Sequence, residues 1–290
     1  MKLLSLIAAV SLAALCQTPT MPGELVDAGG YRVHLYCTGE GSPTVFIAGQ
    51  GFSFDWALVQ PEIAKITRVC TYDPAGTAWS DPGPAITCKN RVAEIRNVLG
   101  NAHIPRPYVL VGFSFGGLVV RSYAHAYPND LAAIVLVDHA FLQPTDQAPS
   151  MKITAPGVDT PPVLIHQEPI VFSVEETSAF NNLPERSREL HHWATSLHPA
   201  LPSGEIAEQC SAEIDKAEGR ADPLGNLPLF VVSTGNDSPN YPKLQAKLLA
   251  LSHDSKQLIA SHSFHSVEID QPDVVVSAIR QAVAAVRNAK

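Results

Sequence analysis

The chain has 290 residues, of which 46% are hydrophobic and 17% are charged. This composition excludes an intrinsically disordered chain, and the length is sufficient to bury a sizeable core. The net charge of −8 disfavours nucleic acids and anionic membrane surfaces as partners.

The N-terminus has the pattern of an export signal. Lys2 precedes a mostly apolar run over residues 3–15, which ends before Gln17 and Pro19. The run is shorter than the roughly 20 apolar residues that span a bilayer, so no stable membrane insertion is expected. We predict a signal peptide over residues 1–16 and a secreted or periplasmic protein. A hydrophobic helix that stays attached is the alternative.

Cleavage after residue 16 leaves four cysteines, Cys37, Cys70, Cys88 and Cys210. An even number in an exported chain permits two disulfides, and several pairings are open. No C-x-x-C or H-E-x-x-H pattern is present, so no metal site is predicted.

Strand-like apolar runs alternate with helical periodicity along the chain. We predict strands over residues 31–36, 44–48, 67–72, 108–111, 134–137, 229–232 and 257–260, and helices over residues 91–99, 118–127, 241–251 and 274–286. This alternation is typical of a doubly wound α/β fold with a mostly parallel sheet.

One long segment, residues 139–226, interrupts the alternation. It is rich in proline and polar residues and contains one predicted helix, 185–197. Segments of this length inside a compact domain are usually functional, so we predict a cap or lid. The core then comprises residues 17–138 and 227–290.

The pattern G-x-S-x-G occurs at residues 112–116 and makes Ser114 the candidate nucleophile. It follows a predicted strand and begins a predicted helix, which is the context that a nucleophile elbow requires. Ser53 stands in the same four letters, but Asp55 and Trp56 follow it and no helical run begins there. The alternative for Ser114 is a structural helix cap.

Backbone N–H groups should stabilise the oxyanion that forms when this serine attacks a carbonyl. One is expected from Phe115, the residue after the nucleophile, and the other from Gln50 in the glycine-containing loop 48–51. An ordinary glycine-rich loop is the alternative for residues 48–51.

The chain order serine, acid, histidine narrows the choice among eleven histidines. His262 and His265 follow the last predicted strand, and we prefer His265 because it is farther from the strand and has a longer reach. His191 and His192 are expected on a solvent-exposed helix face. Asp237, after the strand 229–232, is the first candidate for the acid, and Asp138, after the strand 134–137, is the alternative.

These motifs resemble those of the α/β-hydrolase superfamily. The resemblance covers nearly all of the chain after residue 16 and lies in residues 46–51, 72–81, 111–117, 135–138 and His265. It implies a Ser–His–acid hydrolase without a cofactor. It also implies neighbouring strands for Cys37 and Cys70, hence a Cys37–Cys70 disulfide with Cys88 and Cys210 as the other pair. Many relatives carry His-Gly where this chain has Ala48-Gly49.

The expected reaction is hydrolysis of a small carboxylic ester through an acyl-enzyme. Four residues of the predicted cap, Phe172, Phe180, Leu183 and Trp193, suggest an apolar substrate pocket, with core packing as the alternative. An acyltransferase with the same triad is a second hypothesis. A non-catalytic ligand-binding protein is the third, because fold does not determine function.

Overall fold

The computed structural model describes residues 18–139, 179–199, 201–219, 223–235 and 241–289. The predicted signal peptide, Phe172, Asp237 and much of the predicted cap lie outside these residues.

The described residues form one eight-stranded sheet in the order β1-β2-β4-β3-β5-β6-β7-β8. Its strands are β1 Glu24–Asp27, β2 Arg32–Thr38, β3 Thr44–Ala48, β4 Val69–Asp73, β5 Tyr108–Phe113, β6 Leu131–Val137, β7 Leu229–Thr234 and β8 Ser255–Ala260. Strand β2 pairs antiparallel with β1 and with β4, and every other pairing is parallel. The predicted α/β fold with a mostly parallel sheet is confirmed, with β1 as an additional strand.

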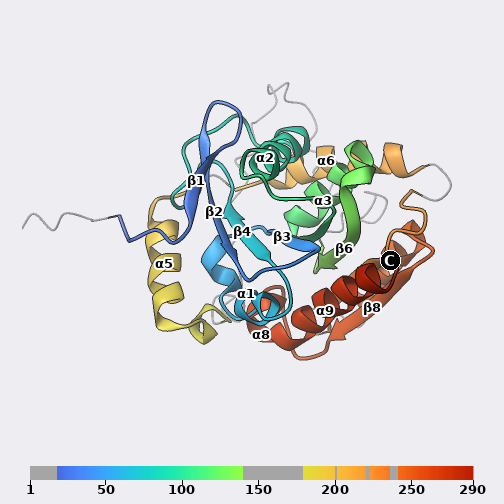
Figure 1. Ribbon diagram of the computed structural model, residues 1–290. Coiled ribbons are helices and arrows are strands. Elements are labelled where there is room, and N and C mark those ends of the chain that lie inside the picture. Colours follow the sequence, from blue (N-terminus) through green and yellow to red (C-terminus); the bar gives the residue numbers. More distant parts are fainter. Residues whose placement is uncertain (1–17, 140–178, 200, 220–222, 236–240, 290) are drawn as a thin grey trace, which may run out of the picture.

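Helices cover both faces of the sheet (Figure 1). The helices are α1 Gln60–Ala64, α2 Cys88–Asn101, α3 Phe115–Ala126, α5 Glu185–Ser196, α6 Gly204–Glu218, α7 Tyr241–Gln245, α8 Val267–Asp270 and α9 Pro272–Asn288, with 3-10 turns η1 Ser53–Trp56, η2 Pro128–Asp130, η4 Phe180–Asn182 and η5 Ala246–Leu251. The side chains of α2, α3 and α6 pack into one core cluster, and those of α1 and α9 pack into a second on the opposite face.

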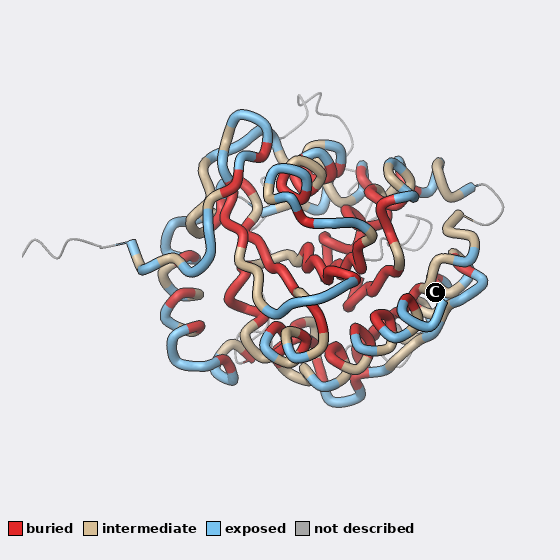
Figure 2. The backbone as a smooth tube through the Cα atoms, in the orientation of Figure 1, coloured by how far each residue is buried: buried red, intermediate tan, exposed pale blue. Residues whose placement is uncertain are grey.

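The central strands supply both clusters because their side chains alternate between the two faces. In β3, Phe46 faces the α2–α3 layer whereas Val45 and Ile47 face α9. Every residue of β3 and β5 is buried, and Figure 2 shows the buried backbone concentrated in the middle of the sheet. This explains why both strands are continuous apolar runs in the sequence.

The predicted helix over residues 241–251 is instead a short α-helix, α7, followed by the 3-10 turn η5. The leucines at positions 248, 249 and 251 still pack against the core. Their apolar spacing therefore fits the tighter turn as well, and spacing alone does not distinguish the two helix types.

Two disulfides join Cys37 to Cys70 and Cys88 to Cys210. Cys37 and Cys70 are direct partners in the β2–β4 register. The second disulfide connects α2 to α6, and Cys210 and Ile214 of α6 are buried in the α2–α3 cluster. Helix α6 therefore packs in the core layer. The predicted cap over residues 139–226, much of which lies outside the described residues, stays a prediction.

No helix in the described ranges combines the length and the apolar character needed to cross a membrane.

Glu268 in α8 is a buried carboxyl group. The residue is 2% exposed, and its Oε2 has no hydrogen-bond partner among the described residues. Burial raises the pKa of Glu268 well above its ordinary value, and the carboxylates of Asp55, Asp270 and Asp138 raise it further. The folded protein therefore keeps this side chain neutral up to a higher pH than an ordinary glutamate.

The pKa of Glu268 is higher in the folded state than in the unfolded state. Folding therefore takes up a proton when the pH lies between these two pKa values. Stability then falls as the pH rises towards the folded pKa, with a slope approaching about 1.4 kcal/mol per pH unit for one proton. We expect Glu268→Gln to remove this contribution and to raise the free energy of unfolding at pH 7. Urea unfolding of both proteins between pH 5 and pH 8 measures how the free energy of unfolding changes with pH. An equal slope in the wild type and the variant contradicts the raised pKa of Glu268.

Candidate active site

Ser114 occupies a strained turn between β5 and α3. Its backbone has φ 52° and ψ −123°, in the left-handed half of conformational space where a residue with a Cβ atom is uncommon. Such a conformation costs on the order of 1–3 kcal/mol and persists only where the surroundings enforce it. The turn places Ser114 at the N-terminus of α3, where the helix dipole favours developing negative charge.

The flanking glycines allow this turn because the backbone segments approach too closely for side chains. A Cβ atom on Gly112 would lie 2.7 Å from the carbonyl oxygen of Gly116. A Cβ atom on Gly116 would collide with the carbonyl oxygen of Ala48 at the end of β3. The elbow is therefore in direct contact with the loop in which an oxyanion donor is predicted.

His265 lies within hydrogen-bonding distance of the candidate nucleophile. It lies between β8 and α8, and its Nε2 is 2.9 Å from the Oγ of Ser114. Its ring packs on Phe113 with 4.9 Å between the centroids. His262, the other candidate, is exposed, and its backbone N–H donates to the side chain of Gln271.

Asp138 completes a hydrogen-bonded chain of three side chains. Its Oδ2 is 2.5 Å from the Nδ1 of His265, and the residue is fully buried. Phe113 and Val137 are partners in the β5–β6 register, so Ser114 and Asp138 follow at neighbouring strand ends. The second of the two candidate acids thus contacts the histidine, whereas Asp237, the first candidate, lies outside the described residues.

Gln50 contacts the nucleophile through its side chain, a role that no sequence pattern indicates. Its Oε1 lies 3.1 Å from the Oγ of Ser114. The hydroxyl has one proton and faces two acceptors, Gln50 and His265, so it donates to one of them at a time. The backbone N–H of Gln50, the predicted oxyanion donor, donates to the carbonyl oxygen of Phe113 at 3.3 Å.

The N–H of Phe115 is the other predicted oxyanion donor. Phe115 is the first residue of α3, so its N–H has no acceptor within the helix. No hydrogen bond within the helix therefore has to break before this N–H donates to an oxyanion.

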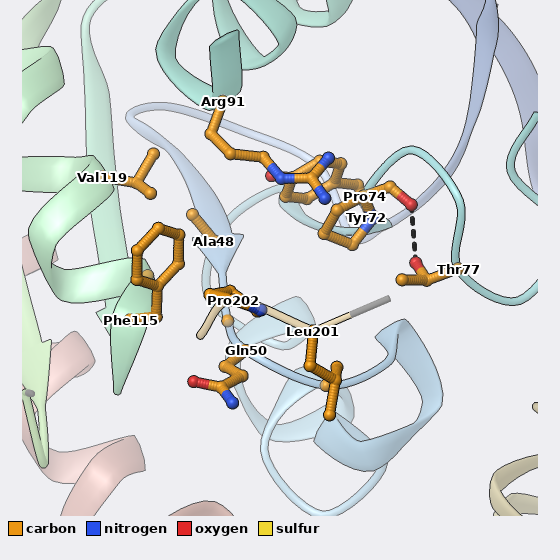
Figure 3. A pocket seen from close by; sticks show the side chains of 13 residues that line it. Ala48, Gln50, Tyr72, Pro74, Thr77, Arg91, Phe115, Val119, Leu201 and Pro202 are labelled. Carbon is orange, nitrogen blue, oxygen red and sulfur yellow. Dashed lines mark hydrogen bonds between the residues drawn. The ribbon is translucent and has the colours of Figure 1, made fainter. Parts of the chain in front are cut away.

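A small cavity of about 30 Å³ lies beside the loop of residues 48–51 (Figure 3). Phe115 and Val119 of α3 form one side of it, and Tyr72 and Pro74 form another. Arg91 also lines it, but this guanidinium is held by the Glu94 carboxylate at 2.9 and 3.1 Å. Because a ligand site needs roughly 300 Å³ or more, this cavity is at most one part of a substrate site.

Aromatic side chains connect the loop after β3 to helix α5. Phe52 and Phe54 pack on each other, Phe54 packs on Trp79, and Trp79 packs on Trp193 of α5. Of the other proposed cap residues, Leu183 is buried against Ile269 and Phe180 packs on a histidine ring. Leu183 therefore contributes to packing, while Trp193 belongs to an aromatic cluster next to the oxyanion loop.

The expectation that both His191 and His192 face solvent is wrong for His191. His192 is exposed, but Nδ1 of His191 lies 2.8 Å from the Oδ1 of Asp55. Burial raises the pKa of Asp55, and the contact with His191 opposes this effect. Because Asp55 also accepts the backbone N–H of Phe52, the contact joins α5 to the chain that leads from the oxyanion loop.

Asp270 stabilises the loop that carries His265, a role that the sequence did not indicate. Its Oδ2 accepts the backbone N–H of Phe264 at 3.1 Å. A position six residues after Phe264 gives no sequence signal for this contact, because the loop conformation decides it. Within the described ranges, no group of three or more His, Cys, Asp or Glu side chains could hold a metal ion.

Comparisons with known proteins agree with this architecture. A family model described as "alpha/beta hydrolase fold" matches residues 43–159. YqjL of Bacillus subtilis, an uncharacterised protein, is 26% identical over 262 residues, which are 88% of each chain. The 2-hydroxymuconate semialdehyde hydrolase of Pseudomonas sp. (strain CF600) is 33% identical over 124 residues, 41% of this chain and 44% of that enzyme.

The fold is shared with solved structures at lower identity. A thermophilic esterase from Thermogutta terrifontis has a TM-score of 0.64 and 19% identity, over 88% of this chain and 94% of the esterase. The sheet order, the turn at Ser114 and these solved structures show that the chain has the α/β-hydrolase fold, and the family model of that name matches residues 43–159 within it.

Proposed function

We propose that this protein is a serine hydrolase that cleaves a carboxylic ester of a small, apolar substrate through an acyl-enzyme. The observation that carries the proposal is the chain of hydrogen bonds from Asp138 through His265 to Ser114, with distances of 2.5 and 2.9 Å. This arrangement supplies a nucleophile, a general base and a group that orients the base.

In the proposed reaction, Ser114 Oγ attacks the ester carbonyl carbon while Nε2 of His265 accepts the hydroxyl proton. The Asp138 carboxylate stabilises the imidazolium that forms. The oxyanion accepts hydrogen bonds from the N–H groups of Phe115 and Gln50, the latter in exchange for its 3.3 Å bond to Phe113. The imidazolium then protonates the departing alcohol, and water attacks the acyl-enzyme with His265 again acting as the base.

An apolar substrate is favoured by the side chains around the elbow and its neighbouring loop. Phe52, Phe54, Trp79 and Trp193 form an aromatic cluster with Leu190 close to the oxyanion loop. The esterase from Thermogutta terrifontis, whose fold this chain shares, supports an ester as the bond that is cleaved. An ester also has a leaving group that needs less assistance than the amine of an amide.

Replacement of Ser114 tests the nucleophile. We expect Ser114→Ala to lower the turnover of p-nitrophenyl esters by roughly 10⁴- to 10⁶-fold and to abolish labelling by a fluorophosphonate probe. The matched control is Ser53→Ala, which removes a hydroxyl in the similar sequence 51–54. The Ser53 side chain does not contact His265, so this variant should retain activity. Wild-type turnover by the Ser114 variant would refute the proposal.

Replacement of each aspartate by asparagine distinguishes the two candidate acids, Asp138 and Asp237. Because the Asp138 carboxylate contacts His265 directly, Asp138→Asn should lower kcat by about 10³- to 10⁴-fold with the fold retained. Asp237→Asn should lower kcat by less than about tenfold, within the range of an indirect effect. The opposite ranking in kcat measurements on purified variants would make Asp237 the acid.

We further propose that the protein acts in a secreted or periplasmic location after removal of residues 1–16. Disulfides persist in oxidising compartments, and the two cysteine pairs of this chain support such a location. Intact mass spectrometry of protein recovered from outside the cytoplasm should give a mature chain beginning at Gln17. A full-length chain with Met1 retained would contradict the cleavage.

A further inference from the structure

The residue after the proposed acid is a buried histidine that contacts both ends of the catalytic arrangement. His139 is fully buried, and its ring lies against Gly117 of α3, where any Cβ atom would collide with it. Its Nδ1 lies 3.5 Å from the backbone carbonyl oxygen of Ser114, and the residue is covalently joined to Asp138. His139 therefore lies between the turn of the nucleophile and the turn of the acid.

The turn at Asp138 requires such support. Asp138 has φ 37°, which is a left-handed backbone conformation. Aspartate adopts it more readily than most residues, but it is still less favourable than a conformation with negative φ. Its N–H donates to the carbonyl oxygen of Val232 on β7, and the carbonyl oxygen of His139 accepts the side-chain amide of Gln245 at 2.7 Å. These contacts hold the backbone on both sides of the acid.

An arginine determines the tautomer of His139. Nη1 of Arg121 donates to Nε2 of His139 at 2.7 Å, so this nitrogen carries no proton. The proton of the neutral ring is then on Nδ1, which faces the carbonyl oxygen of Ser114. Burial first and the nearby Arg121 charge second lower the pKa of His139 well below its ordinary value, in agreement with a neutral ring.

The arginine is itself fixed from another helix. Its Nε donates to the Oε1 of Glu218 at 2.9 Å and its Nη2 donates to the Oε2, which makes a bidentate ion pair between α3 and the last residue of α6. Both side chains are buried, at 6% and 8% exposure. A broken pair would leave a buried charge without compensation, so the arrangement strongly favours one geometry.

We infer that His139 is a positioning residue, held by Arg121 and Glu218, that keeps the Asp138 carboxylate against His265 and the turn of Ser114 in place. This inference rests on the proposed function for its kinetic consequences. It also gives α6 a role in the site, because Glu218 at the end of this helix influences the placement of the acid without contacting the reacting atoms.

The test compares two substitutions at one position. His139→Leu removes both polar ring atoms, whereas His139→Gln places an amide oxygen near the former Nε2 and can still accept from Arg121. We expect His139→Leu to lower kcat by about 10- to 100-fold, as small misplacements of reacting groups do, with KM changed by less than about twofold. His139→Gln should recover most of the loss. His125→Gln is the matched control, because His125 also contacts Glu218 at 3.2 Å but does not touch the elbow, and it should retain the wild-type kcat.

A second readout does not require turnover. The Nδ1 proton of His265, in its 2.5 Å contact with Asp138, should give a far-downfield proton resonance at low pH, identified by its loss in Asp138→Asn. We expect His139→Leu to shift or broaden this resonance and His125→Gln to leave it unchanged. If wild-type protein cleaves no ester, the proposed function fails, and this resonance alone decides the inference.

Three results would overturn the inference. The first is a His139→Leu variant whose kcat and downfield resonance both match the wild type. The second is an equal loss of kcat in His139→Leu and His139→Gln. The third is an equal loss of kcat in the His125→Gln control. If His139→Leu does not fold, as judged by near-ultraviolet circular dichroism, Glu218→Gln replaces it. This variant weakens the same network from its far end and should lower kcat by about three- to tenfold with unchanged KM; an unchanged kcat would overturn the inference.

Discussion

The close approach of α3 to the end of β3 is the constraint on which the candidate site depends. The two glycines of the elbow allow backbone to lie against backbone where no Cβ atom fits. This contact forces Ser114 into a conformation that an unconstrained residue avoids, and it brings the residues that face the hydroxyl within reach of it. The energy of the strain is offset by the burial of β5 and α3 in the two core clusters.

The parallel sheet determines which acid can serve the histidine at the shortest distance. Strand β6 lies between β5 and β7, so the residue after β6 is next to the nucleophile, while a residue after β7 starts one strand farther away. His265 reaches back from β8 across this edge of the sheet, with Asp270 holding its loop. An acid after β6 therefore needs little loop of its own, but it needs a backbone turn that aims the carboxylate at the imidazole.

Several long-range contacts tie the surrounding segments to this edge of the sheet. The Cys88–Cys210 disulfide connects α6 to α2, and the Arg121–Glu218 ion pair connects α6 to α3. The contact between His191 and Asp55 connects α5 to the chain that follows the oxyanion loop. Parts of the predicted cap thus interact with the core through buried or partly buried polar groups, in addition to the aromatic cluster around Trp79.

The sequence by itself determined the fold class, the elbow at Ser114 and the choice of His265 over His262, because these depend on local periodicity, on turn chemistry and on order along the chain. It also placed α6 within a cap and His191 on an exposed face, since helical periodicity does not reveal what lies opposite a helix. Only the tertiary structure decided that Asp138 contacts His265, that Gln50 faces the nucleophile with its side chain, and that α6 joins the core layer. Each of these is a contact between residues far apart in sequence, set by strand order and by loop conformations that no local pattern encodes.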